Sequence, residues 1–221
     1  MKNNHVILPR TDSKGMYYMS YSQANKWKKS KREYIRDYFM GEDNGEALKP
    51  YGDFGHQVGH AFELKDFTPF NKEEIKFLKT VPQFDKFETK VKLQFDGFYL
   101  KGYIDTHTKE QDGYIKTIAD YKTGEIVKRK PDYESDDYIQ LDLYAAALEQ
   151  KYGKLPDEAY VYLIGRSGNA FAKEELKLTL ELETIERKLS EEKCQAAIKS
   201  IEEIALEISE HYKIFLKLNG L

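Results

Sequence analysis

The stretch GYIDTHTKEQDGYIKTIADYKTG, residues 102–124, decides the fold and the chemistry expected of this chain. Apolar and polar residues alternate on both sides of a polar turn that contains Asp112-Gly113, a dipeptide typical of hairpins. Two neighbouring antiparallel strands are therefore predicted. The first ends at Asp105, and the second carries Asp120 and Lys122. Charged groups gathered in this way are unusual in strands that should fill a core.

Side-chain alternation places Asp120 and Lys122 on one face of the second strand, with Tyr121 on the other. Neighbouring strands lie about 4.8 Å apart, so a register that matches Asp105 with Asp120 crowds two carboxylates and an ammonium together. Such carboxylates raise one another's pKa unless a cation neutralises them. Mg²⁺ takes one or two carboxylates and leaves positions for water and phosphate. The pattern therefore predicts metal-dependent phosphoester hydrolysis.

A simpler explanation exists for each of these residues. An Asp-x-Lys tripeptide arises by chance in most proteins of this size, and an Asp at a strand end commonly forms a turn. The surrounding sequence has to decide between a metal site and chance.

Outward from this stretch, apolar spacing predicts helices and strands in a definite order. Helices are expected over 20–39, 54–67, 137–152 and 182–216, the third ending at Gly153. Strands are expected over 86–95, 98–107, 114–122, 159–165 and 171–182, with a polar loop around Pro131.

The first three strands form an antiparallel meander in this prediction. A helix between the third and fourth strands needs a crossover, so the sheet is mixed and the fold class is α/β. We expect one domain over residues 1–221, with a core at about 20–165 and a C-terminal strand and helix at about 170–221. The last helix is amphipathic and suits either self-association or packing on its own core.

Composition sets limits on the class of protein. Hydrophobic residues make up 40% of the 221 positions, as in soluble globular proteins. No apolar run is long enough to span a membrane, and the start of the chain lacks a secretory signal. Cys194 is the single cysteine, which excludes a multi-thiolate zinc or iron–sulfur site and suits a cytoplasmic location.

The net charge of −3 restricts nucleic-acid binding to local basic patches. Two basic runs are present, one over Lys26–Arg32 and one over Lys128–Lys130. Either run can equally be a solvated face without a ligand.

Several motifs together resemble the RecB-type branch of the PD-(D/E)XK nuclease superfamily. The resemblance runs through most of residues 20–165 and rests on five motifs in the family's order. These are Ser20 and Ser22 at the first helix, Gly55 or Gly59 with His60 in the second, GYID ending at Asp105, DYKTG from Asp120 to Gly124, and Gln140, Tyr144 and Ala145.

The resemblance implies a role for each matching residue. Asp105, Asp120, the backbone carbonyl of Tyr121 and His60 would bind Mg²⁺ or Mn²⁺. Lys122 would orient the attacking water and stabilise charge in the transition state.

Further residues are candidates with open alternatives. Gln140 and Tyr144, one helical turn apart, would border the active site and contact Lys122 or the DNA backbone. Tyr144 can equally be a core residue. His56 is the alternative to His60 as a metal ligand, and Glu63 is an outside candidate.

The implied function is a divalent-metal-dependent DNA nuclease, most simply an exonuclease that acts on ends or single strands. The chain lacks a phosphate-binding loop and cluster cysteines, so it resembles a stand-alone nuclease from a phage or mobile element, with a role in recombination or repair. One alternative is a DNA-end or partner-binding module with a vestigial site. Another is a hydrolase of small phosphoesters, for which the surface from Trp27 to Arg32 would be unused.

Overall fold

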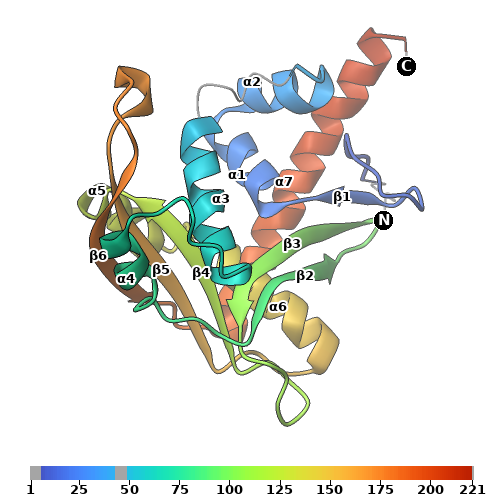
Figure 1. Cartoon of the computed structure of the whole chain (residues 1–221). Helices are drawn as coiled ribbons and strands as arrows, with labels where there is room; N and C mark the ends of the chain where they lie inside the picture. Colours follow the sequence, from blue (N-terminus) through green and yellow to red (C-terminus); the bar gives the residue numbers. More distant parts are fainter. Residues whose placement is uncertain (1–5, 43–48, 221) are drawn as a thin grey trace.

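A mixed six-stranded sheet forms the centre of the molecule (Figure 1). The computed structural model describes residues 6–42 and 49–220. Strand β3 pairs with β1 and β4 along one edge and with β2 along the other, and β5 and β6 continue the sheet beyond β4. The β4–β5 pair is parallel and β2–β3, β3–β4 and β5–β6 are antiparallel, which confirms the predicted α/β class. The strands are β1 (Tyr17–Met19), β2 (Lys86–Gln94), β3 (Phe98–His107), β4 (Thr117–Gly124), β5 (Glu158–Ser167) and β6 (Lys177–Glu186).

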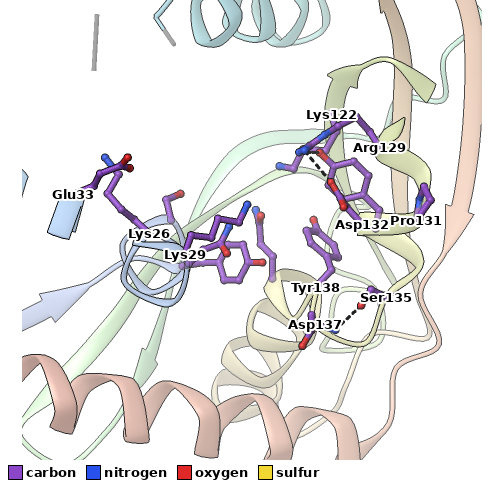
Figure 2. A pocket seen from close by; sticks show the side chains of 15 residues that line it. Lys26, Lys29, Glu33, Lys122, Arg129, Pro131, Asp132, Ser135, Asp137 and Tyr138 are labelled. Atoms are coloured by element: carbon purple, nitrogen blue, oxygen red, sulfur yellow. Dashed lines mark hydrogen bonds and ion pairs between the residues drawn. The ribbon is translucent and has the colours of Figure 1, made fainter. Parts of the chain in front are cut away.

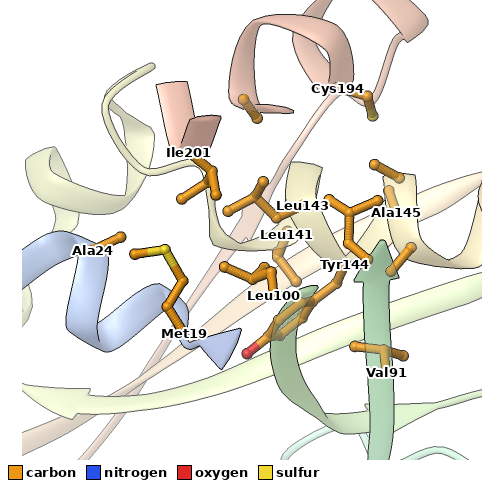
Figure 3. Packing of buried hydrophobic residues seen from close by; sticks show 14 of the residues in the cluster. Met19, Ala24, Val91, Leu100, Leu141, Leu143, Tyr144, Ala145, Cys194 and Ile201 are labelled. Carbon is orange, nitrogen blue, oxygen red and sulfur yellow. The ribbon is translucent and has the colours of Figure 1, made fainter. Parts of the chain in front are cut away.

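Helices cover both faces of this sheet and enclose two apolar cores. One core lies between the sheet and helices α1, α6 and α7, and the other lies between the sheet and helices α3 and α4 (Figure 1). Figure 3 shows the first core, in which Met19, Leu100 and Leu141 meet. The helices are α1 (Tyr21–Lys29), α2 (Lys31–Tyr34), α3 (Lys49–Glu63), α4 (Lys72–Leu78), α5 (Ile126–Glu134), α6 (Gln140–Tyr152) and α7 (Glu191–Leu218).

Turn and cap residues fix the ends of the elements as the sequence predicts. Ser20 caps α1 through a capping box with Gln23, and Gly153 ends α6 in the left-handed conformation at φ +75°. The meander turns at Gly97 and Gly113, which also adopt positive φ.

The meander opens between its second and third strands. Only Thr106 with Ala119 and His107 with Ile118 pair between β3 and β4. Further along β3, the same edge is taken by the short parallel strand β1, which pairs with Phe98–Leu100. The gap between these two pairings is where the charged residues of the opening stretch lie.

Several predicted elements differ from the structure. The helix predicted at 54–67 is α3 over Lys49–Glu63, and the strand predicted at 171–182 is β6 over Lys177–Glu186. The segment around Pro131 is helix α5 and not a loop; it shows little apolar periodicity because Tyr133 is its one fully buried residue. The predicted helix 20–39 breaks at Ser30, which ends α1 and caps α2, and continues as a π-helical turn over Ile35–Phe39. The last helix begins at Glu191 and not at 182, because residues up to Glu186 complete β6. Strand β1 and helix α4 were not predicted.

The C-terminal helix α7 packs on its own chain. Its buried residues Cys194, Ala197, Ile201 and Ile208 belong to the core that α1 and α6 also line. The indole nitrogen of Trp27 donates to Glu207 on this helix at 2.8 Å. Trp27 itself is buried, so its predicted place on an aromatic and basic surface was wrong. A homo-oligomer or protein partner bound through this helix stays a prediction.

Within residues 6–42 and 49–220, no helix is both long enough and apolar enough to span a bilayer.

Candidate active site

Asp105 and Asp120 lie at matching positions where β3 and β4 separate, near enough for Asp120 to raise the pKa of Asp105. Thr106 pairs with Ala119, so the next position of the same register matches Asp105 with Asp120. The backbone ladder stops here, and the N–H of Tyr121 donates instead to Oδ2 of Asp105 at 2.8 Å. A carboxylate thus replaces a backbone carbonyl as the acceptor, and the sequence prediction that two acids meet on neighbouring strands agrees with this geometry.

Asp120 is fully buried and held by three side chains. Its Oδ2 accepts from the hydroxyl of Tyr138 at 2.8 Å and lies 2.5 Å from the ammonium of Lys122. Its Oδ1 accepts from the amide of Gln140 at 3.0 Å. A buried carboxylate needs this many partners because its desolvation is otherwise costly.

Lys122 is paired with Asp120 and also feels the charge of Asp105. Burial lowers the pKa of its ammonium, but the attraction of Asp120 and then of Asp105 outweighs burial, and the pKa is raised overall. The Lys122 side chain is 27% exposed. Its ammonium is bonded to Asp120 while part of its aliphatic stem still contacts solvent. Tyr121, on the other face of β4, packs against Phe62 of α3 with ring centres 4.5 Å apart.

Asp105 carries the less favourable charge of the pair. Burial and then the neighbouring Asp120 raise its pKa well above the usual range of a carboxyl group, while Lys122 and the Tyr121 N–H oppose this shift. A single ammonium faces two carboxylates, so the site is short of positive charge. This deficit is what a divalent cation would supply.

Helix α3 forms one wall of a cavity of about 530 Å³ that Asp105 lines from the sheet, while the buried Asp120 lies behind it. His56, His60 and Glu63 line it from α3, one helical turn after another, and Asp105 and Lys122 line it from the sheet. Both histidines reach this space, so the choice between His56 and His60 as ligand stays open. Among the residues that the structure describes, no three His, Cys, Asp or Glu side chains are already drawn together as metal ligands.

The donor types nevertheless fit Mg²⁺ or Mn²⁺. Two carboxylates suit a hard divalent ion, and an imidazole from α3 makes Mn²⁺ a good alternative. Asp105 lacks a full positive partner, and burial and Asp120 raise its pKa; both facts favour a cation at this point.

Two residues of the site were missed by the sequence analysis. Tyr138, which precedes α6, donates directly to Asp120. Glu88 of β2 lines the cavity at the position that matches Asp105, because its neighbours Phe87 and Thr89 pair with Thr106 and Ile104.

Glu88 is held in an unusual conformation. Its φ is +47°, a strained value for a residue other than glycine. The residue as a whole is exposed, but partial desolvation of its carboxyl in the cavity and then the nearby Glu63 raise the pKa of that carboxyl. Strain of this kind persists where the surrounding structure enforces it, often at functional sites.

Gln140 and Tyr144 connect Asp120 to the core. The amide of Gln140 donates to Asp120 and also lies 3.1 Å from the hydroxyl of Tyr144. The Tyr144 ring passes directly over Gly102 of β3, where an added Cβ would lie 2.3 Å from Cε1 of the ring. The two alternatives for Tyr144 are thus both true in part, since it is buried in the core and also touches the site.

Gly102→Ala is therefore expected to displace Tyr144 and to destabilise the protein by about 1–3 kcal/mol, the usual cost of overpacking a core. Urea unfolding followed by circular dichroism measures this loss. Gly59→Ala is the matched control, because no atom lies within 4 Å of a Cβ added there. Equal stability of the two variants would contradict the close contact between the Tyr144 ring and Gly102.

A second cavity, of about 740 Å³, opens on the other side of Lys122 (Figure 2). Lys26 and Lys29 line it from α1, and Arg129 lines it from α5, so the two basic runs of the sequence meet here. Much of this charge is paired: Lys26 bonds Asp37 and Arg129 bonds Asp132. The basic runs are thus in part solvated ion pairs and in part the wall of this cavity.

The carboxylate pair, the lysine two residues further on and the helix behind them define the class of this protein. The family model described as "PD-(D/E)XK nuclease superfamily" matches residues 60–213, and the chain belongs to this superfamily. This family membership agrees with the resemblance that the sequence motifs indicate.

Two curated relatives are helicase/nuclease subunits from bacteria. The chain is 28% identical over 126 residues to an ATP-dependent helicase/nuclease subunit from Clostridium novyi (strain NT). It is 37% identical over 65 residues to the protein of the same name from Thermoanaerobacter sp. (strain X514). These matches cover 55% and 29% of the chain but only 10% and 5% of the relatives, so the chain spans about a tenth or less of the length of those proteins.

A solved structure shares the fold. A protein from Eubacterium rectale, provisionally named an exonuclease, superposes with a TM-score of 0.50 at 15% identity, over 92% of this chain and 88% of that one. At this identity the likeness concerns the fold alone.

Proposed function

We propose that the chain is a divalent-metal-dependent deoxyribonuclease that hydrolyses phosphodiester bonds. The observation that carries the proposal is the pair Asp105 and Asp120, with Lys122 bonded to Asp120, at the opening between strands β3 and β4. In this proposal Asp105, Asp120, the Tyr121 carbonyl and His60 hold Mg²⁺ or Mn²⁺. When bound there, such an ion would supply polarisation of the phosphoryl oxygen and a water of lowered pKa.

The protein's own groups position the reaction in this proposal. The Lys122 ammonium would face the developing charge on the phosphate, and a cation beside Asp120 would replace it as the partner of that carboxylate. Gln140 and Tyr138 keep Asp120 in place from the α6 side. Glu88 adds a third carboxylate to the cavity and can accept a hydrogen bond from the attacking water.

An exonuclease acting on DNA ends or single strands is the form of this activity that we propose, in recombination, repair or the processing of phage DNA. The name of the Clostridium novyi relative, an ATP-dependent helicase/nuclease subunit, supports a nuclease that works on DNA. The lone buried Cys194 is compatible with a reducing, cytoplasmic compartment.

Cleavage of labelled single- and double-stranded DNA on denaturing gels tests the proposal. We expect product with Mg²⁺ or Mn²⁺, none with EDTA, and recovery of cleavage when excess metal is added back. A ladder from one end would support an exonuclease. Cleavage that EDTA leaves unchanged would contradict the metal site, and DNA binding without cleavage in either metal would favour a binding module with a vestigial site.

A further inference from the structure

The outward face of the β2–β3 hairpin carries a row of lysines and tyrosines. Cross-strand pairs place Lys90 opposite Tyr103 and Lys92 opposite Lys101, and residues opposite each other share one face. The residues between them, among them Val91 and Leu93, are buried in the core behind the sheet, so this face points away from that core. We call it the lysine–tyrosine face; it comprises Tyr18, Lys90, Lys92, Tyr99, Lys101 and Tyr103.

The side chains of this face contact one another. The Lys92 ammonium lies 4.2 Å from the centre of the Tyr99 ring, and that ring stacks on Tyr18 with centres 5.7 Å apart. Lys101 lies 5.6 Å from the Tyr18 ring centre and 5.3 Å from that of Tyr103. Tyr103 is 41% exposed, which is a large fraction for a tyrosine in the interior of a strand.

The charge of the face is available to a ligand. No ion pair joins Lys90, Lys92 or Lys101 to an acid in the described ranges 6–42 and 49–220. Asp12, at the end remote from the active site, accepts from the hydroxyl of Tyr99 at 3.1 Å. These three lysines, of which Lys92 and Lys101 hold their ammonium groups over aromatic rings, form a local positive strip on a chain of net charge −3.

The face leads directly to the active site. The pair that follows Lys90 and Tyr103 toward the site, beyond Thr89 and Ile104, is Glu88 and Asp105, and both of these line the cavity. Alternate residues of a strand are roughly 6.6 Å apart. Tyr103 therefore lies one such step from Asp105, and Lys101 lies two steps away.

We propose that the lysine–tyrosine face holds a single strand of DNA on its way to the carboxylate pair. Lysines at regular intervals meet successive phosphates, and the exposed ring of Tyr103 stacks on an unpaired base beside the scissile bond. A duplex keeps its bases stacked inside and offers nothing to Tyr103. This inference rests on the proposed function and names its substrate as a single strand.

Fluorescence anisotropy with a labelled oligothymidine of about 15 nucleotides, in EDTA to prevent cleavage, tests the face. The variant Lys90→Ala/Lys92→Ala/Lys101→Ala is expected to bind about tenfold or more weakly. Its dependence of log Kd on log salt should be flatter by about 2, since each phosphate contact on a single strand contributes about 0.7. Lys76→Ala/Lys188→Ala/Lys199→Ala removes the same charge from exposed positions elsewhere and should retain the wild-type affinity.

The aromatic contact has its own test. Tyr103→Ala is expected to weaken binding about fivefold or more, while Tyr103→Phe keeps the ring and the affinity. Loss of affinity by the same factor in both lysine variants would overturn the proposal, because charge alone would then explain binding. A second result would also overturn the proposal: poly-glutamate displaces the oligonucleotide, and Tyr103→Ala binds the oligonucleotide as tightly as the wild type. The face would then be assigned to an acidic protein partner.

Hydrolysis of a small p-nitrophenyl phosphodiester separates this inference from the proposed function. Such a substrate occupies only the metal site, so the face variants should hydrolyse it at the wild-type rate. Wild-type protein that binds the strand through the face but hydrolyses neither substrate would contradict the nuclease and leave the face standing. If the wild-type protein cleaves DNA and the triple lysine variant binds the strand with undiminished affinity, the nuclease stands and the inference about the face is contradicted.

Discussion

Lys122→Met is expected to lower the rate of DNA cleavage by about 10²–10³-fold, the usual effect of removing one group that stabilises charge in a transition state. The same change leaves Asp120, with a side chain 1% exposed, without its cation. Breaking a buried pair in this way costs about 3–5 kcal/mol. The metal-free variant should therefore unfold at a lower temperature than the wild type.

Added Mn²⁺ distinguishes the two effects of this variant. Because a bound cation would replace the missing ammonium beside Asp120, Mn²⁺ should raise the thermal midpoint of Lys122→Met more than that of the wild type. Cleavage should stay low all the same. Lys76→Met, on the surface of α4, is the matched control and should change neither quantity. Near-wild-type cleavage by Lys122→Met would place the chemistry elsewhere.

Asp105→Asn is expected to abolish cleavage and yet to stabilise the metal-free protein. The folded state raises the pKa of Asp105, mainly through burial and then through Asp120, so between the unfolded and folded pKa values the folded state binds more protons. Its contribution to stability is present below the unfolded pKa and is lost as pH rises through the folded pKa. Asparagine has no such charge, and its carbonyl can still accept from the Tyr121 N–H.

Thermal unfolding in EDTA across pH 4–9 (roughly the range in which carboxyl groups and histidines titrate) measures this difference. At high pH the midpoint of Asp105→Asn should exceed that of the wild type by at least about 2 °C, and the gap should close at low pH. Asp120→Asn is the comparison, because Asp120 is paired with Lys122 and its loss should destabilise. A wild type that is more stable than Asp105→Asn at high pH would show that Asp105 is not electrostatically strained.

Much of the site follows from local sequence. Strand alternation alone places Asp120 and Lys122 on one face and Tyr121 on the other, as the contacts of Tyr121 with Phe62 show. The apolar spacing of α3 places Phe54, Val58 and Phe62 in the core. The histidines and Glu63 are left on the side that meets the cavity.

Glu88 could also have been found from the sequence. The Asp96-Gly97 turn sets Phe95 opposite Phe98, where the Phe95 N–H donates to the Phe98 carbonyl at 2.9 Å. Counting back along both strands from this pair brings Glu88 opposite Asp105. The same count places the lysine–tyrosine face on one side of the hairpin, so hairpin register locates residues that the sequence motifs do not include.

Other features depend on tertiary packing and leave little trace in the sequence. Tyr138 reaches Asp120 from the loop before α6, and its orientation is fixed by contacts such as that with Tyr133, whose rings meet edge to face at 5.2 Å. Strand β1 has only three residues, too few for periodicity to be recognised. Helix α5 contains a proline and has a single fully buried side chain, so its pattern resembles that of a loop.

Anomalous diffraction from a crystal containing Mn²⁺ tests the central claim most directly. We predict one strong peak at the opening of β3 and β4, with oxygens of both Asp105 and Asp120 at bonding distance and the Lys122 ammonium moved off Asp120. A peak bound to only one of these carboxylates, or a Mn²⁺ site elsewhere with Lys122 still paired to Asp120, would contradict the account.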